Sequence, residues 1–141
     1  KVYAVDVGHN QLDWKLRSNE KVVSMEGTHI KNLKSDSLPL SPTFICIDTS
    51  FISLKNVLPE VLRIISDTRG VDVIALIKPQ HEVGKDKVGK GGIVRDAALH
   101  KEVTNDISNF AQNIGFKVNG LVESPIEGAT GNKEYLIHLS H

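Results

Sequence analysis

Three residues that can take part in acid–base or binding chemistry, Asp6, Asp48 and Lys78, each come directly after an apolar run. Ligands of open α/β sheets bind at the carboxyl ends of strands, so these positions are candidates for a site. An acidic residue after an early strand commonly binds the ribose hydroxyls of a nucleoside, and a turn-capping role explains Asp6 equally well. Asp48 is harder to explain as a cap. Lys78 is followed by proline, which favours a side chain in a crevice over one that reaches outward to solvent.

The segment between Lys78 and Arg95 is rich in glycine and lysine. Gly84–Gly91 nearly matches the phosphate-binding loop of nucleotide hydrolases, but Gly91 stands where that loop needs a Ser or Thr to hold Mg²⁺. We therefore reject a nucleotide hydrolase. A flexible loop remains, able to embrace a phosphate backbone, although composition alone slightly favours a solvated surface loop. Its candidate contacts are Lys85, Lys87, Lys90 and Arg95.

Other catalytic and metal chemistries lack their motifs. The six histidines show no ligand spacing, and a single cysteine cannot build a zinc site, so we expect no metal. No Gly-x-Ser-x-Gly elbow of a serine hydrolase occurs. Cys46 lies within an apolar run and is expected to be an inert core thiol.

Apolar patterning predicts strands alternating with helices. Strands are expected at 2–5, 21–25, 43–47, 71–77, 116–122 and 135–139, and helices at 11–17, 54–65 and 97–114. Asn10 is the expected cap of the first helix, and Asp96 and Gly115 bound the third. Pro59 implies that the second helix is kinked or begins late, near Asn56.

This order predicts an α/β protein with a mostly parallel sheet. The last two strands have no helix between them and should pair antiparallel, as in the methyltransferase version of the Rossmann architecture. The run Val71–Ile77 has almost no polar face, which favours burial on both sides of the sheet.

Composition bounds the remaining choices. The chain has 141 residues, 40% of them hydrophobic, which suits one globular domain. Its 17 basic and 17 acidic residues balance, so it is not a polybasic protein. No apolar run approaches the roughly 18 residues of a membrane helix, and one cysteine fits a reducing cytosol. The chain opens on a strand without an initiator methionine, and we interpret it as a piece of a longer protein.

Several strings together resemble the TlyA-type proteins, historically named haemolysins and characterised as 2′-O-methyltransferases of ribosomal RNA. In chain order the strings are Tyr3–Gly8, Asp48–Leu54, Leu76–Gln80, Gly89–Asp96 and Ser124–Glu134, with Ser124-Pro125-Ile126 and Gly131-Asn132-Lys133-Glu134 as the matching parts of the last. They span the whole chain, and only their combination is specific.

The resemblance implies a fold like that of the FtsJ-type ribose methyltransferases, whose catalytic group is a Lys-Asp-Lys-Glu tetrad. Asp48, Lys78 and Glu134 match its last three members. The first lysine would lie upstream of Lys1, together with an S4-like RNA-binding domain, the first strand and a glycine-rich cofactor loop. Residues 1–141 are then a partial methyltransferase domain. His81 departs from the phenylalanine expected in many relatives.

The resemblance also implies a cofactor and a partner. S-adenosylmethionine would be bound by Asp6, Val7, Gly27, Thr28, His29 and Asp48, with Asp6 at the ribose and residues 27–29 flanking the adenine. Ribosomal RNA would be the substrate, in the cytoplasm. Without the upstream lysine and loop, we expect this chain alone to be inactive and to bind the cofactor poorly.

Two alternatives and one structural expectation remain. A membrane-permeabilising haemolysin would need an amphipathic or spanning segment and export, and the sequence shows neither. A non-catalytic RNA-binding fragment is the other alternative. If the first strand of the methyltransferase sheet is absent, the strands that end at Asp6 and Asp48 should be separated by a gap.

Overall fold

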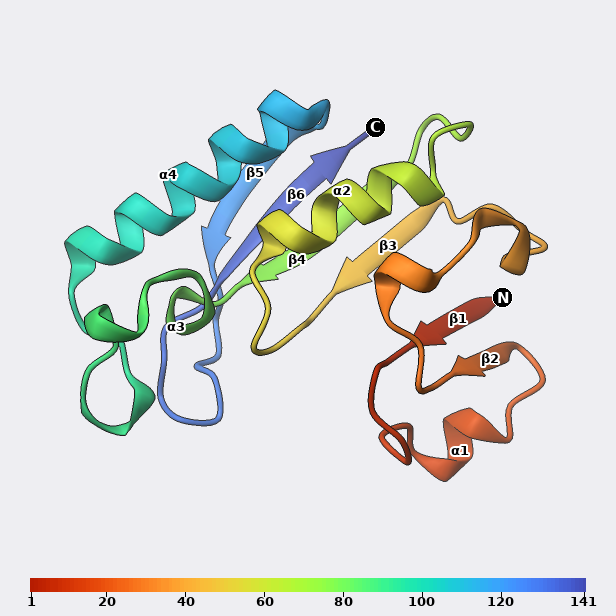
Figure 1. Cartoon of the computed structure of the whole chain (residues 1–141), viewed down its shortest axis with the longest axis horizontal. Helices are drawn as coiled ribbons and strands as arrows, with labels where there is room; N and C mark the ends of the chain where they lie inside the picture. The colour runs from red at the N-terminus through yellow and green to blue at the C-terminus, as the bar shows by residue number, and fades with distance from the viewer.

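The computed structural model describes residues 1–141 and divides their strands between two sheets (Figure 1). β1 (Val2–Val5) and β2 (Val22–Met25) form a parallel pair. The second sheet has the order β3 (Phe44–Ile47), β4 (Asp72–Ile77), β6 (Tyr135–Ser140) and β5 (Lys117–Glu123). β1 and β3 are not hydrogen-bonded to each other, so the predicted gap between them is confirmed.

The four-stranded sheet is mixed, as the order of elements predicted. β3 and β4 run parallel, whereas β6 runs antiparallel to both β4 and β5. The register pairs Ile77, the last residue of β4, with Tyr135, the first of β6. The carboxyl ends of β3 and β4 and the start of β6 therefore meet at one edge of the sheet.

Two helices, α2 (Leu54–Ile64) and α4 (Ala97–Ile114), cover one face of this sheet (Figure 1). Their apolar stripes pack on alternate residues of the strands, including Val73 and Ile137, which are fully buried. The expectation that β4 is buried on both faces is wrong, because its residues alternate between buried and more accessible. No helix of the chain has both the length and the apolar character needed to cross a membrane.

The other face of the four-stranded sheet is left open by these helices. Phe44 on β3 and Val122 on β5 are about 60% exposed there. Cys46 is also exposed, so its assignment to the core is wrong. The reason is the two-residue period of a strand: Ile45 and Ile47 turn toward the core, and Cys46 between them turns away.

The helix boundaries test the capping signals. Asp96 and Gly115 bound α4 as predicted, with Gly115 in the left-handed conformation at φ 118°. α2 begins at Leu54 behind the Ser53 cap, so a later start near Asn56 is wrong. Pro59 lies inside α2 at an exposed position.

The first predicted helix is much shorter than expected. α1 spans only Trp14–Arg17 and is capped by Asp13, so Asn10 is not the cap. Residues 10–12 are not helical, because their backbone N–H groups donate hydrogen bonds to the Glu26 carboxylate at 2.9–3.2 Å. Tertiary hydrogen bonding thus overrides the local helical pattern.

Short turns make up the remaining connections. The 3₁₀ turns η1 (Ile30–Asn32) and η2 (Ser35–Ser37) lie between β2 and β3. After β4 come the short helix α3 (Pro79–Glu82) and the turns η3 (Lys85–Lys87) and η4 (Lys90–Gly92). The segment expected to be one loop therefore opens with a helical turn.

The β1–β2 unit adds no buried residue to the protein, since the first buried position along the chain is Leu33. Tyr3, Val5 and Met25 nevertheless pack, partly buried, against the core. Hydrogen bonds add to this attachment. The Tyr3 hydroxyl accepts a hydrogen bond from the Leu40 backbone at 3.1 Å, and Arg63 of α2 donates to three carbonyl oxygens, the shortest bond being 2.8 Å to Leu33.

Candidate active site

The predicted catalytic residues come from three elements that end or begin at one sheet edge. Asp48 follows β3, Lys78 follows β4, and Glu134 precedes β6. Since β6 is antiparallel to β4, its first residues lie at the carboxyl end of β4. Topology alone therefore brings together residues that are far apart in the sequence.

Lys78 forms an ion pair at this edge. Its Nζ lies 2.6 Å from Asp48 Oδ1 and donates a hydrogen bond to Ser50 Oγ at 3.1 Å. The Lys78 side chain is 13% exposed, whereas that of Asp48 is 73% exposed. The amine is thus held in the protein surface, while the carboxylate remains open to a ligand.

Glu134 is buried and is bonded differently. Its Oε1 accepts a hydrogen bond from Gln80 Nε2 at 3.0 Å, and no ion pair joins it to Lys78. Gly128 lies so close to this carboxylate that a side chain there would collide with it. The other amide atom of Gln80, Oε1, is buried without a partner. The structure therefore pairs Lys78 with Asp48 and places Glu134 as a separate acceptor behind them.

His81 and Phe51 form an aromatic pair beside the Lys78–Asp48 ion pair. Their ring centres are 4.9 Å apart at an interplanar angle of 55°. Burial and the Lys78 ammonium lower the pKa of His81, and Glu134 acts in the opposite direction. Phe51 is 93% exposed and has φ 64°, a conformation that costs an aromatic residue of order 1–3 kcal/mol. Sequence reasoning missed Phe51.

Glu82 joins the two loops that carry Asp48 and Lys78. At the end of α3, its carboxylate accepts hydrogen bonds from Ser53 Oγ at 2.5 Å and from the Leu54 backbone at 2.9 Å. Burial raises the pKa of Glu82, and the hydrogen bonds from Leu54 and Ser53 oppose that rise. These bonds fix the start of α2 against α3 and so position Lys78 relative to Asp48.

Asn132 plays a similar role for Glu134. It is fully buried, its Oδ1 accepts from the Val94 backbone at 3.0 Å, and its Nδ2 donates to Gly92 O at 2.9 Å. The segment before α4 is thereby tied to the loop that precedes β6. Neither Glu82 nor Asn132 could be assigned this role from the sequence, because each depends on a partner about 30–40 residues away.

The residues predicted to bind a nucleoside cluster at the end of β1. Asp6 Oδ1 accepts from Gly8 N at 2.7 Å, and the Asp6 carbonyl accepts from Thr28 N at 2.9 Å. Gly27 has φ 66° and packs against the His9 ring, which leaves no room for a side chain.

Two of the predicted nucleoside contacts are arranged differently. Val7 is 64% exposed. His29 is engaged in its own turn, where Nδ1 accepts from Lys31 N at 3.2 Å. The structure therefore brings Asp6, Gly27 and Thr28 together and leaves Val7 at the surface.

Comparison with known proteins decides the family. A model described as FtsJ-like methyltransferase matches residues 1–141. The chain belongs to the FtsJ-like methyltransferase family. Lys78 and Asp48 therefore lie at the carboxyl edge of the sheet in a member of this family.

Some relatives of this chain are named as rRNA methyltransferases and others as hemolysins. The chain is 39% identical over 138 residues to the 16S/23S rRNA (cytidine-2′-O)-methyltransferase TlyA of Mycobacterium tuberculosis, with 98% of the chain and 51% of that protein covered. It is 40% identical over 139 residues to hemolysin A of Brachyspira hyodysenteriae, with 98% and 57% covered. The chain spans about half the length of the curated relatives it matches.

A solved structure from Streptococcus thermophilus, described as a candidate hemolysin, superimposes with a TM-score of 0.91 at 45% identity. The superposition covers 98% of this FtsJ-like methyltransferase chain and 50% of the other. The sheet order and helix placement are therefore those of an experimentally determined relative.

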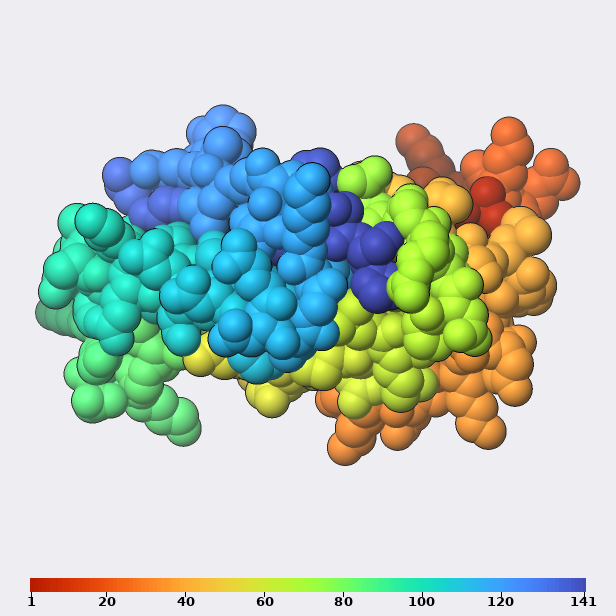
Figure 2. Space-filling model, turned by 90° about the horizontal axis from the view of Figure 1, so that it is seen from above, coloured from red at the N-terminus to blue at the C-terminus, as the bar shows by residue number.

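The predicted RNA-contacting residues of this methyltransferase lie between α3 and α4. Lys85, Lys87 and Lys90 are on η3 and η4, which project from the body as the bright green segment at the lower left of Figure 2. Lys87 lies 3.8 Å from Glu102 of α4, while Lys85 and Lys90 form no ion pair. The Arg95 guanidinium lies beside Gly89, the residue before Lys90, and Arg95 also lines a cavity beside α4.

The described residues fit one part of a nucleoside cofactor. Asp6 has one carboxylate oxygen engaged with Gly8 and the other without a partner, at the mouth of a cavity of about 130 Å³ that Leu12 and Glu26 also line. An acceptor of this kind suits a pair of ribose hydroxyls. No group of three or more His, Cys, Asp or Glu side chains is arranged to hold a metal ion.

Proposed function

We propose that the chain carries the catalytic part of an enzyme that methylates ribose 2′-hydroxyls of ribosomal RNA. The observation that carries this proposal is the 2.6 Å pair of Lys78 and Asp48 at the carboxyl edge of a methyltransferase sheet. Relatives in Mycobacterium tuberculosis and Campylobacter jejuni are named as rRNA (cytidine-2′-O)-methyltransferases, which supports the choice of substrate.

Methylation of a ribose hydroxyl requires an oriented oxygen and a place for its proton. S-adenosylmethionine supplies an electrophilic methyl group when bound. Lys78 orients the hydroxyl oxygen with the one N–H group that Asp48 and Ser50 leave free, since an ammonium has three. Asp48, largely exposed, would accept hydrogen bonds from the bound cofactor.

The same pair limits what Lys78 does alone. A lysine takes up a proton only as the neutral amine, and a carboxylate at 2.6 Å stabilises the ammonium. A second cation near Lys78 would favour the neutral amine. The resemblance to FtsJ-type enzymes supplies such a group as a lysine before residue 1, so residues 1–141 would be the second part of the catalytic domain.

The cofactor and RNA would approach this edge from different sides. Asp6 is the proposed partner of the cofactor ribose, with Gly27 and Thr28 beside the adenine and Val7 and His29 next to them. Lys85, Lys87 and Lys90 would contact RNA phosphates from the segment that projects before α4. The Phe51 ring, exposed beside Lys78, offers a surface on which an unpaired base can stack. A ribosomal RNA substrate supports a cytoplasmic location, which is part of this proposal.

Product analysis tests the proposal. The whole protein is incubated with ribosomal RNA and S-adenosylmethionine labelled in its methyl group, and the RNA is then hydrolysed with alkali. Because a 2′-O-methyl group blocks alkaline cleavage at its own nucleotide, the label should appear in an alkali-resistant dinucleotide. The matched control is RNA with a 2′-deoxyribose at that nucleotide, which should take up no label. Label on a base, or no transfer by the wild-type protein, would overturn the proposal.

A further inference from the structure

The start of α3 holds the two acidic side chains of the proposed catalytic edge apart. Lys78, directly before α3, is paired with Asp48 at 2.6 Å. Gln80, in the single turn of α3, donates from Nε2 to Glu134 Oε1 at 3.0 Å. Pro79 between them is fully buried, which fixes this segment against the protein. One short, anchored segment therefore carries the partner of each carboxylate.

The register of the sheet by itself would favour a different pairing. Ile77 is opposite Tyr135, so the next position along each strand sets Lys78 opposite Glu134. Opposite charges at facing positions of neighbouring strands attract each other. Lys78 nevertheless pairs with Asp48, and no ion pair joins it to Glu134. A contact on the Glu134 side must therefore keep these two side chains apart.

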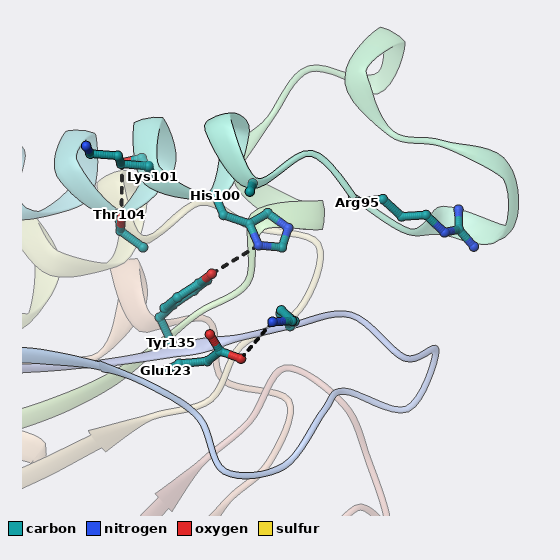
Figure 3. Close-up of a pocket in the computed structure, with 8 residues that line it drawn as sticks. Arg95, His100, Lys101, Thr104, Glu123 and Tyr135 are labelled. Atoms are coloured by element: carbon teal, nitrogen blue, oxygen red, sulfur yellow. Dashed lines mark hydrogen bonds and ion pairs between the residues drawn. The ribbon is translucent and has the colours of Figure 1, made fainter.

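Glu134 is enclosed at the start of β6. The residue is 7% exposed, and a side chain at Gly128 would collide with its carboxylate. A 3.0 Å hydrogen bond joins Tyr135, the next residue, to His100 of α4 and anchors this end of the strand (Figure 3). The one donor to the Glu134 carboxylate is Gln80 Nε2. The direction of the carboxylate is thus set by the Gln80 amide.

The Gln80 amide is only half satisfied. An ionised carboxylate accepts hydrogen bonds and donates none, so Gln80 has to present Nε2 to Glu134. Its Oε1 is left buried without a donor. A buried acceptor without a partner lowers stability, and such departures from good packing concentrate at functional sites. The orientation of Gln80 therefore points to a role beyond the stability of the fold.

We propose that Gln80 is a positioning residue, which holds the Glu134 carboxylate away from Lys78 and so keeps one Lys78 N–H free for the target hydroxyl group. Asp48 and Ser50 already engage Lys78, and an ammonium has only three N–H groups. A buried carboxylate without its donor would pair with a cation that faces it. Lys78 would then have no N–H left for the hydroxyl group.

This inference rests on the proposed function for the identity of the hydroxyl group. It adds to the site a residue that acts through Glu134 and Lys78 and touches neither the cofactor nor the RNA. An uncharged amide suits this task, because it binds the carboxylate without adding a cation that competes with Lys78.

Gln80→Met in the whole protein keeps the length of the side chain and removes the donor. The kcat for methyl transfer to ribosomal RNA should fall about 10- to 100-fold, since a misplacement of about 1 Å costs up to about 10²-fold. The KM values for RNA and for S-adenosylmethionine should stay within about twofold, because Gln80 contacts neither. Gln112→Met, at an exposed position of α4, is the matched control and should change none of these values.

Gln80→Asn covers the case in which Gln80→Met does not fold. It keeps the amide but withdraws it by one methylene group, which breaks the 3.0 Å bond to Glu134. Its kcat should fall in the same way, again with unchanged KM values. A rise in both KM values together with the loss of kcat would indicate general damage to the site and would overturn the proposal.

A crystal structure of the Gln80→Met protein tests the cause directly. Lys78 Nζ should lie within about 4 Å of a Glu134 carboxylate oxygen, the usual limit of an ion pair. An unchanged kcat, or a Lys78 that keeps its wild-type contacts and stays apart from Glu134, would overturn the proposal. If the wild type transfers no methyl group to RNA but Lys78 moves onto Glu134 in the variant, the proposed function fails and the separating role of Gln80 stands.

Discussion

The two edges that would meet at a methyl-transfer site are built very differently. At the proposed catalytic edge, Lys78 and Glu134 are largely covered and lie directly beside the ends of strands whose inward residues include the fully buried Ile77 and Ile137. At the cofactor edge, Asp6 and Val7 are exposed, and the β1–β2 unit contains no buried residue. One edge is formed by the core of the four-stranded sheet, and the other by loops attached to it.

The supporting hydrogen bonds show the same contrast. The half-buried Glu82 carboxylate and the buried Asn132 amide connect the loops of the proposed catalytic edge. At the proposed cofactor edge, the Glu26 carboxylate accepts hydrogen bonds from three backbone N–H groups and forms an ion pair with Arg17. The geometry of the proposed catalytic edge therefore rests mainly on covered groups within the four-stranded sheet, whereas that of the proposed cofactor edge rests on the hydrogen bonds of Glu26.

The largest expected difference concerns stability. Val73→Ala, on the inward face of β4, should lower the free energy of unfolding by about 2–3 kcal/mol, because it removes two buried methyl groups and leaves a cavity. Val23→Ala, in half-buried β2, should cost about 1 kcal/mol or less. Urea unfolding of both variants measures the two values. Equal losses would mean that both sheets belong equally to the core.

Glu82 offers a smaller test of the catalytic edge. Glu82→Ala leaves the Leu54 N–H and the Ser53 hydroxyl without their acceptor and should cost about 1–3 kcal/mol in thermal or urea unfolding. Glu82→Gln, the matched control, retains an acceptor for Leu54 and should lose much less.

The pH dependence of the folding stability shows whether the Glu82 carboxyl group contributes through its protonation, and not only through the packing of its side chain. Its pKa is raised in the folded protein, so the folded state binds the proton more tightly than the unfolded state. Its contribution to stability is therefore present at low pH and decreases as the pH rises through the unfolded and then the folded pKa. Glu82→Gln should remove this decrease, and a decrease of unchanged size would contradict the assignment.

Much of this architecture could be predicted because it depends on short-range sequence patterns. The apolar runs before Asp6, Asp48 and Lys78 predicted three strand ends, and Asp96 and Gly115 predicted both ends of α4. Cys46 and Asn10 were misassigned because their surroundings are decided by the tertiary structure, through an uncovered sheet face and the Glu26 carboxylate.

The site was predicted less completely than the fold. Strand order and the family motifs placed Asp48, Lys78 and Glu134 at one edge. Glu82 and Phe51 could not be assigned, since one acts through a residue 28 positions away and the other through a backbone conformation that no sequence pattern shows.

The smallest expected effect lies at the cofactor edge. Hydrogen bonds from the Asn10 backbone and its neighbours hold the pKa of Glu26 below its usual value. The stabilisation it provides is therefore complete above the pKa of the unfolded state and is lost as the pH falls through the lower folded pKa. The protection of the residue 10–12 amides, which is their exchange rate relative to that of an unstructured peptide at the same pH, should fall on acidification, and Glu26→Gln should show low protection and relatively fast exchange already at neutral pH. Slow exchange in that variant would show that other contacts hold the loop.

The most direct measurement compares methyl transfer and cofactor binding in one variant of the whole protein, Lys78→Ala. In Lys78→Ala, methyl transfer to ribosomal RNA should fall by at least about 10²-fold, the usual contribution of a positioned acid–base group. The affinity for S-adenosylmethionine should stay nearly unchanged. Asp48→Ala, closer to the cofactor side, should impair both. Near-normal methylation by Lys78→Ala would contradict the assignment of this lysine to the reaction.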